Sequence, residues 1–411
     1  MRYSLILICV ALFPTLLQSA DNLPQFRGPT GQGHYPVNRA PLQWSEAADN
    51  VAWKVEIDGL GWSSPVVADG QIWLTTATDE GRSLRVLALD IDSGKERLNS
   101  EVFHREEAGT IHAKNSHASP TPIIAGDRVF VHFGTYGTAC LATSGSVVWR
   151  REIEYKHVHG PGGSPELVDN VLVISCDGGD RQFVVGLDAN SGQTLWQTER
   201  PENPHAKKFA FSTPLAIEEG GANQVVSPGA GGVSSYDPHS GREIWRVDYP
   251  EGYSVIPRPV RGLGMVFVSS SFDKPRLLAI RTDGAGNVTE SHVAWKLDRG
   301  APHSASALLV DRELYIVSDR GVAACLDAAT GEVHWQERLG GNFSASPLLA
   351  AGRIYFQNEQ GETTIILPGK QYQELAKNEL PGRTLATPTP IEGALLVRTE
   401  TALYRINAER E

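Results

Sequence analysis

Positive charge is scarce in this sequence. Its 411 residues include 37 Lys and Arg against 48 Asp and Glu, which gives a formal net charge of −11 at pH 7. Proteins that bind nucleic acids or anionic membranes neutralise phosphate with clustered basic side chains. The charge balance therefore argues against a nucleic-acid partner and against an anionic membrane surface.

Cysteine is scarce as well. The sequence has only Cys9, Cys140, Cys176 and Cys325, and no CxxC or CxxCH motif occurs. This spacing gives no support for a zinc ribbon, a thioredoxin-like redox site or a c-type haem. Beyond residue 20 an odd number of cysteines remains, which cannot pair off completely, so we expect them to be small buried packing residues.

Long apolar runs are absent beyond the first twenty residues. Residues 1–20 begin with Arg2, continue with a short apolar stretch and end on the small Ser19 and Ala20. This is the pattern of a secretory signal peptide, and the apolar stretch is short for a membrane span. We therefore expect an exported protein of the periplasm or cell envelope, with no transmembrane segment in the mature chain. An uncleaved anchor is the alternative.

Helical periodicity is missing too, whereas glycine-containing turns recur. Four segments share one spacing, with Asp, then Gly four residues later, then a large apolar residue after four more: ALDIDSGKERL (88–98), GLDANSGQTLW (186–196), SYDPHSGREIW (235–245) and CLDAATGEVHW (325–335). Asp accepts backbone hydrogen bonds at a turn, and Gly supplies the left-handed position that a tight turn needs. Each segment is therefore predicted to be a β-hairpin.

Two landmarks give the period of the repeat. The large apolar residue recurs every 40 to 51 residues, at Trp53, Leu98, Trp149, Trp196, Trp245, Trp295 and Trp335. A proline that leads into an apolar strand recurs at Pro65, Pro120, Pro165, Pro214, Pro257, Pro347 and Pro388, with Ala307 once in its place. Units of this length with about four strands are typical of propeller blades.

We therefore predict an all-β, eight-bladed β-propeller. The expected organisation is a signal peptide at 1–20, an N-terminal extension at 21–49 and the propeller at 50–407. The last proline is followed by only two more strands, so the N-terminal strand around residues 50–57 should complete the final blade and close the ring.

The Ala-x-Asp-x-x-x-Gly-x-x-x-Trp spacing resembles the tryptophan-docking repeat of PQQ-type propellers, over roughly residues 50–407. That family includes the quinoprotein alcohol dehydrogenases and the non-enzymatic BamB subunit of the outer-membrane β-barrel assembly machinery. The resemblance implies that the repeat tryptophan of each blade packs against the neighbouring blade. The residues concerned are Trp53, Trp149, Trp196, Trp245, Trp295 and Trp335.

The sequence also departs from the enzymes that it resembles. No two cysteines are neighbours, and no residues match the calcium and base positions of the quinoprotein dehydrogenases. We therefore expect a non-catalytic binding or scaffold protein, possibly BamB-like, with no catalytic residues, no cofactor and no metal. The alternative is a PQQ-dependent quinoprotein-type oxidoreductase.

Histidines and aromatic residues gather before the proline steps. In a propeller this step leads to the innermost strand of each blade, so the residues before it should surround one mouth of the central channel. The candidates are Trp62, His117, Phe211, Tyr253, His303 and Phe343, with His157 and His159 nearby. They could bind a small ligand or a protein partner on the loop face, or only pack the channel. His157 and His159 could also supply two metal ligands.

Two segments rich in acidic residues resemble ligand-binding loops. We expect Asp177, Asp180 and Arg181 to form a surface ion pair or a turn cap. The stretch that contains Asp283 and Asn287 looks like a calcium loop but lacks flanking helices, so we expect an exposed loop.

Overall fold

The computed structural model describes residues 22–203, 205–249 and 251–409. The expected signal peptide at 1–20 lies outside these residues. In the described part, regular structure is almost entirely β, and the helical elements are α1 (Thr289–His292) and two single-turn 3-10 segments. No helix in this part is long and apolar enough to cross a membrane. The prediction of an all-β chain is confirmed.

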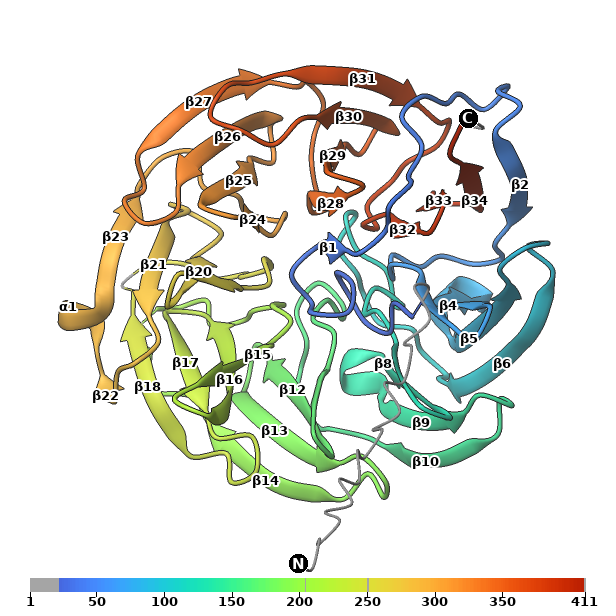
Figure 1. Ribbon diagram of the computed structural model, residues 1–411. Coiled ribbons are helices and arrows are strands. Elements are labelled where there is room, and N and C mark those ends of the chain that lie inside the picture. The colour runs from blue at the N-terminus through green and yellow to red at the C-terminus, as the bar shows by residue number, and fades with distance from the viewer. Residues whose placement is uncertain (1–21, 204, 250, 410–411) are drawn as a thin grey trace, which may run out of the picture.

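Eight sheets stand around a common axis, as in a propeller with eight blades (Figure 1). Blade 1 contains β3 (Val66–Ala68), β4 (Gln71–Thr78), β5 (Ser83–Asp90) and β6 (Glu96–His104), and blade 2 contains β7 (Ile123–Ala125), β8 (Arg128–His132), β9 (Thr138–Ala142) and β10 (Val147–Arg151). Blade 3 contains β11 (Glu166–Val168), β12 (Val171–Asp177), β13 (Gln182–Asp188) and β14 (Thr194–Glu199), and blade 4 contains β15 (Leu215–Glu219), β16 (Ala222–Gly229), β17 (Gly232–Tyr236) and β18 (Glu243–Asp248). Blade 5 contains β19 (Val260–Gly262), β20 (Met265–Ser269), β21 (Leu277–Arg281) and β23 (Val293–Leu297), and blade 6 contains β24 (Leu308–Val310), β25 (Glu313–Val317), β26 (Val322–Asp327) and β27 (Val333–Arg338). Blade 7 contains β28 (Leu348–Ala350), β29 (Arg353–Gln357), β30 (Glu362–Ile366) and β31 (Glu374–Glu379), and blade 8 contains β32 (Thr389–Ile391), β33 (Ala394–Arg398), β34 (Ala402–Asn407) and β2 (Val51–Glu56).

The N-terminal strand closes the ring, as predicted. Strand β2 pairs antiparallel with β34, with Val55 opposite Leu403, and so forms the outer strand of blade 8. Because the two ends of the chain share one blade, the backbone hydrogen bonds between β2 and β34 close the ring.

The repeat tryptophans lie between neighbouring blades. The indole nitrogen of Trp149 donates to the carbonyl oxygen of Ala189 at 2.9 Å, and its ring covers Gly192 in the hairpin of the next blade. The same bond joins Trp53 to Ile91, Trp196 to Pro238, Trp295 to Ala328 and Trp335 to Gly369. Leu98 covers Gly145 in the same way.

Trp245 is the exception among them. It is fully buried, but its indole nitrogen donates to Gln224 of its own blade, at 3.1 Å. The hairpin that it would otherwise cover carries the insertion with Asp283 and Asn287. Part of that insertion, β22 (Gly286–Asn287), pairs parallel with β18 and adds a fifth strand to blade 4. The segment expected as a simple exposed loop therefore reinforces a blade edge.

Small residues lie opposite the repeat tryptophans. Gly186 pairs with Trp196, and a Cβ atom at this position would come within 2.3 Å of the indole ring. Cys140 and Cys325 occupy the same place opposite Trp149 and Trp335. Both thiols are free and buried, as is that of Cys176, which confirms the expectation of packing residues.

Asp177 was expected at the surface, but the structure buries it. Its carboxylate accepts two hydrogen bonds from Arg200, at 2.6 and 2.7 Å, inside the ring. Asp180, in contrast, caps the turn as expected and accepts from the backbone nitrogens of Lys156 and Arg181. A buried carboxylate persists because a guanidinium with matching geometry compensates its lost hydration.

The N-terminal extension enters the central channel. Residues 22–35, here called the plug, form a bridge from Leu23 to Val67 and end in β1 (His34–Tyr35), which pairs parallel with β28 near the centre of the ring (Figure 1). The backbone carbonyl of Pro24 accepts from Ile124 at 2.8 Å. The plug bonds to the innermost strands of three blades, β3, β7 and β28, and these backbone bonds hold it at one end of the channel.

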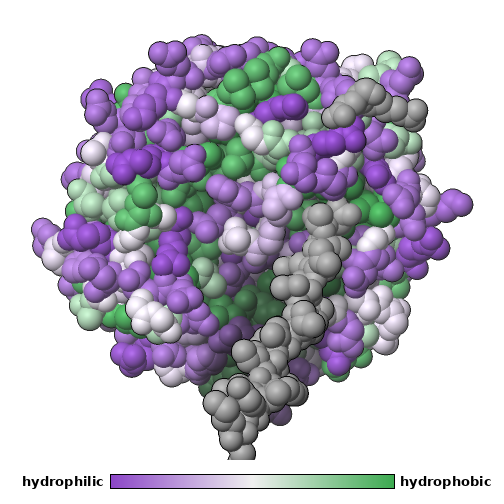
Figure 2. All heavy atoms as spheres, in the orientation of Figure 1, coloured by the Kyte–Doolittle hydropathy of each residue, from purple (hydrophilic) through white to green (hydrophobic). Residues whose placement is uncertain are grey.

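Hydrophilic residues cover most of the visible face in Figure 2, with hydrophobic residues showing between them. The large apolar side chains are instead buried in clusters between adjacent blades. The core is therefore a ring of layers around the channel, and the channel itself is free to carry polar groups.

Candidate functional site

A cavity of about 730 Å³ lies on the propeller axis. Phe26 of the plug lines it, so the cavity is closed toward the plug and opens on the opposite face. We call it the axial cavity. Its volume is in the range of sites that hold small organic ligands.

Two tiers of side chains form the wall of the axial cavity. The lower tier is the residue directly before the inner strand's proline or its equivalent in each blade: Ser64, Thr121, Ser164, Thr213, Arg258, Ser306, Ser346 and Thr387. The upper tier lies two residues earlier: Trp62, Ser119, Gly162, Phe211, Ile256, Ser304, Ser344 and Leu385. In extended chain, residues two apart point to the same side, which is why both tiers face the axis.

The lower tier carries seven hydroxyls, and we call it the hydroxyl ring. Six of these hydroxyl oxygens accept a hydrogen bond from the backbone nitrogen of the preceding ring member, at 2.9 to 3.0 Å. All seven residues are buried and line the cavity. The eighth member, Arg258, does not line the cavity; its guanidinium donates to Glu166 at 2.5 Å and to the carbonyl of Phe26 in the plug at 2.8 Å.

Above the tiers, aromatic rings form an arc along the cavity rim. Consecutive ring centroids lie 5.1 to 5.5 Å apart, mostly edge to face, in the order His112, His159, Phe209, Tyr253, Phe272 and His303. Edge-to-face pairs are the favoured arrangement of aromatic side chains, and they hold one another in place. We call this set the aromatic arc.

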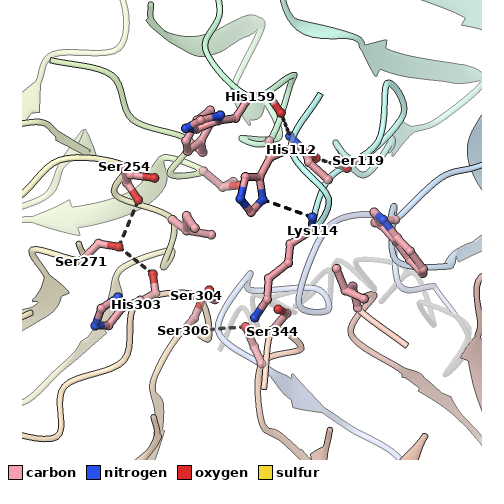
Figure 3. A pocket seen from close by; sticks show the side chains of 18 of the residues that line it. His112, Lys114, Ser119, His159, Ser254, Ser271, His303, Ser304, Ser306 and Ser344 are labelled. Carbon is pink, nitrogen blue, oxygen red and sulfur yellow. Dashed lines mark hydrogen bonds between the residues drawn. The ribbon is translucent and has the colours of Figure 1, made fainter. Parts of the chain in front are cut away.

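Cationic side chains flank the arc. Lys207 donates to the Tyr253 hydroxyl at 2.9 Å, with its ammonium 4.7 Å from the ring centroid. Lys114 extends from the opposite wall toward Ser344 (Figure 3) and pairs with the buried carboxylate of Glu359 at 2.7 Å. Of these two ammonium groups, only that of Lys114 has a carboxylate partner in the described part of the chain.

Asp319 is the only carboxylate among the described residues that line the cavity. Its oxygens accept from the backbone nitrogens of His303 and Ser304, both at 3.0 Å, and from the Ser304 hydroxyl at 2.8 Å. The group is thus used to hold the rim loop that carries His303.

Five of the residues expected at the channel mouth line the cavity. Trp62 and Phe211 belong to the upper tier, whereas His159, Tyr253 and His303 belong to the aromatic arc. The Trp62 indole nitrogen is buried and has no hydrogen-bond partner among the described residues.

His117 and Phe343 lie elsewhere, because the expected register was shifted. Strand β7 begins after Pro122 rather than Pro120, so Ser119 and not His117 faces the axis. The same correction applies to β19, which follows Pro259 rather than Pro257. Phe343 is one residue off the tier position of Ser344, and this single step directs its ring into the core between blades.

His157 lies beside the cavity rather than in it. Its ring contacts Tyr136 at 4.9 Å and, with His132, lines a separate small pocket. Burial lowers the pKa of His157 to about 4 and that of His132 to about 3, so both are neutral at pH 7.

His157 and His159 do not converge on one point. His159 adopts a left-handed backbone with φ of 68° and contacts His112 in the aromatic arc. Burial also lowers the pKa of His159. Within the residues that the structure describes, no three His, Cys, Asp or Glu side chains gather as metal ligands.

The hydroxyl ring and the plug were not anticipated from the sequence. A signal for the ring was present, because Ser or Thr directly precedes the inner-strand Pro or Ala in seven of the eight blades. The plug has no repeat pattern, and the segment QFRGPTGQG gives no sign of where it lies.

Comparison with known proteins agrees with this architecture. A family model described as outer membrane protein assembly factor BamB matches residues 39–206, 109–289 and 229–367, which together span 39–367. The chain belongs to this family of PQQ-like propellers. No curated protein matches this BamB-family chain.

Solved structures match the BamB-family chain over most of its length. BamB from Moraxella catarrhalis is 15% identical with a TM-score of 0.60, covering 87% of this chain and 99% of that one. A europium-containing methanol dehydrogenase is 11% identical with a TM-score of 0.62, covering 93% and 91%. The quinohemoprotein alcohol dehydrogenase of Comamonas testosteroni is 10% identical with a TM-score of 0.53, covering 95% and 81%. These likenesses establish a shared fold between this chain, a BamB and two dehydrogenases.

Proposed function

We propose that the protein is an exported, non-catalytic binding protein that holds a small ligand in the axial cavity. The observation that carries this proposal is the cavity itself, which the plug closes at one end. Its mouth combines a continuous aromatic arc with polar and cationic groups. Sites of this composition orient a ligand by stacking and a few hydrogen bonds.

The alternative, a quinone cofactor with a bound cation, fits the lining residues less well. The aromatic faces and ammonium groups suit a planar carboxylate. A divalent cation, however, needs several clustered oxygen ligands. Asp319 is the only described carboxylate in the lining, and its oxygens already accept three hydrogen bonds. The residues therefore do not fit a cation-bound quinone, and we derive no reaction step from it.

Ligand binding can be tested with N-phenyl-1-naphthylamine, a neutral aromatic probe that fluoresces in apolar sites. We expect saturable binding to the purified protein. Binding should be lost in Ile256→Trp, which fills the upper tier, and retained in Leu195→Trp. Leu195 is a matched control because it is 51% exposed on β14, outside the lining. Equal binding by both variants would refute the axial cavity as the site.

The non-catalytic part of the proposal has its own test. The protein is incubated with PQQ and Ca²⁺, and dye-linked alcohol oxidation is measured. We expect no turnover above that of the cofactor alone. Turnover that Ile256→Trp abolishes would overturn the proposal in favour of the oxidoreductase. Export is checked by N-terminal sequencing of protein from the cell envelope, where an intact residue 1 would contradict cleavage.

A BamB-like scaffold role is the second candidate, and apolar exposure at the rim favours it. Phe272 of the aromatic arc is 47% exposed at the rim, and Ile256 in the upper tier below it is 39% exposed. Exposed apolar side chains around a concave site are typical of protein contacts. A photo-crosslinking residue at position 272 should capture a specific envelope protein in cells, whereas one at position 195 should not. Equal labelling from both positions would contradict this role.

A further inference from the structure

The hydroxyl ring contains hydrogen-bond donors that have no acceptor among the described residues. Each hydroxyl has one proton to donate and lone pairs to accept. Six of the seven accept a backbone N–H, and none of the seven donates to another protein atom in the described part of the chain. Their protons are therefore free to point into the cavity that all seven line.

Buried guanidinium groups surround this ring. Arg27 of the plug donates to the carbonyl of Ala307, next to a ring member, at 2.6 Å. Arg398 donates to the carbonyl of Ser63, next to another, at 3.0 Å. Both side chains are fully buried, and among the described residues they bond only to carbonyl and hydroxyl oxygens. Burial lowers the pKa of each to about 9, which leaves both charged at pH 7.

The positive charge near the ring exceeds the negative charge. Arg258, the third buried guanidinium, is paired with Glu166, the carboxylate beneath the tier. Three guanidinium groups thus face one carboxylate around the closed end of the cavity. In an interior of low dielectric constant, this imbalance favours a negative group on the axis.

We propose that the hydroxyl ring binds the oxyanion of an amphipathic ligand, such as a carboxylate, sulfonate or phosphate group. The oxyanion accepts hydrogen bonds from the ring, and its aromatic or apolar body lies between Trp62, Phe211 and Ile256 of the upper tier. Hydrogen bonds to a charged acceptor are about twice as strong as neutral ones, so several convergent hydroxyls select for charge. This inference rests on the proposed ligand-binding function and names the ligand class.

Two fluorescent probes with the same aromatic skeleton, one anionic and one neutral, distinguish the oxyanion site from ligand binding in general. The sulfonate 8-anilinonaphthalene-1-sulfonate differs from N-phenyl-1-naphthylamine by its anionic group. We expect the sulfonate to bind at least about ten-fold more tightly, and only weakly to Ile256→Trp. Equal affinities would overturn the oxyanion site but leave ligand binding intact. If neither probe binds, the proposed function fails as well.

Substitution within the ring tests the donors. Ser64 is the most suitable position, because its hydroxyl accepts no backbone N–H from the residues that the structure describes, and Ser64→Ala therefore leaves none of them unpaired. We expect the sulfonate to bind about three- to ten-fold more weakly to Ser64→Ala, with unchanged affinity for the neutral probe. An equal loss for both probes would refute hydrogen bonding to the anion.

A second substitution guards against effects on folding. Thr213→Val removes a hydroxyl that also accepts from Ser164, whereas Thr213→Ser keeps it. At equal melting temperature, only the valine variant should lose affinity for the sulfonate. Competition with benzoate, phenyl phosphate and benzyl alcohol then identifies the oxyanion. The alcohol should be the weakest competitor, and equal competition by all three would contradict the proposal.

Discussion

The outer hairpins and the upper tier of the axial cavity are parts of the same repeat, but they differ in how uniform they are. At the outside, Trp149, Trp196 and Trp295 each make the same bond to the same place in the next blade. At the upper tier, equivalent positions hold residues as different as Trp62, Gly162 and Ser344. The comparison shows that the contacts of the repeat tryptophans, here called the joints between blades, are nearly uniform, whereas the upper tier tolerates variation that gives the cavity a specific shape.

The largest loss of stability is expected when a repeat tryptophan is removed from a joint between blades. Trp196→Ala removes a buried indole that covers Gly241 and donates to Pro238. We expect the free energy of unfolding, measured with urea, to fall by about 3–5 kcal/mol, with probe binding unchanged in the folded protein. Leu195→Ala, at an exposed neighbour, should change it by less than about 0.5 kcal/mol. Loss of probe binding by the folded Trp196→Ala protein would show that joints and cavity are coupled.

A somewhat smaller loss of stability is expected at the axis from Glu166→Gln. This change leaves the buried guanidinium of Arg258 without its counter-charge, which should cost about 3 kcal/mol of unfolding free energy. Unlike Trp196→Ala, Glu166→Gln should also change ligand binding, because the added positive charge should tighten binding of the anionic probe. Weaker binding of the sulfonate to the folded variant would contradict the electrostatic part of the oxyanion proposal.

Lowering the pH should affect the stability contributed by the buried His132 at a higher pH than that contributed by the carboxylates of the outer hairpins. His132 has an ordinary pKa when unfolded and a pKa of about 3 when folded, so its contribution to stability is complete above pH 6.5 and falls as the pH drops toward 3. This contribution should decrease by roughly 2 kcal/mol between pH 7.5 and pH 5. The hairpin carboxylates Asp188 and Asp327 have lowered pKa values, and their contribution is lost only below about pH 4.

The measurement is thermal unfolding of the wild type and of His132→Gln at pH 7.5 and pH 5. The variant should lose less stability than the wild type over this interval. His157 also has a lowered pKa of about 4 in the folded protein, and it takes up a proton in the unfolded chain over the same interval, so some pH dependence should persist. An unchanged pH dependence in His132→Gln would exclude this residue as its source.

The smallest effect on stability is expected in the upper tier. Phe211→Ala removes a ring that lies 5.7 Å from Phe209 and lines the cavity. We expect the neutral probe to bind about five-fold more weakly, which corresponds to about 1 kcal/mol. Phe211→Leu, with a similar volume, should lose less. If Phe211→Ala destabilised the fold as much as Trp196→Ala, the distinction between joints and tiers would be wrong.

The fold was predictable from the sequence because its signals are local and repeated. Asp188, Gly192 and Trp196 lie within nine residues of one another, and the same spacing recurs around the chain. The register of the axis was less accessible. The segments SPTP and IPRP each offer two prolines, and a strand pattern with a period of two looks the same after a shift of two residues. His117 was therefore placed at the mouth instead of Ser119.

The sequence by itself determined the ring: the hairpin pattern recurs within single repeats, and the number and order of the landmarks along the chain predict eight blades and closure by the N-terminal strand. Only the tertiary structure decided what lies on the axis. Ser64, Thr213 and Thr387 are far apart in the chain, and they line one cavity because the ring closes. The plug occupies the channel through backbone pairing with strands far away in sequence, as between β1 and β28. Contacts of this kind depend on geometry around the axis, which no local pattern of residues records.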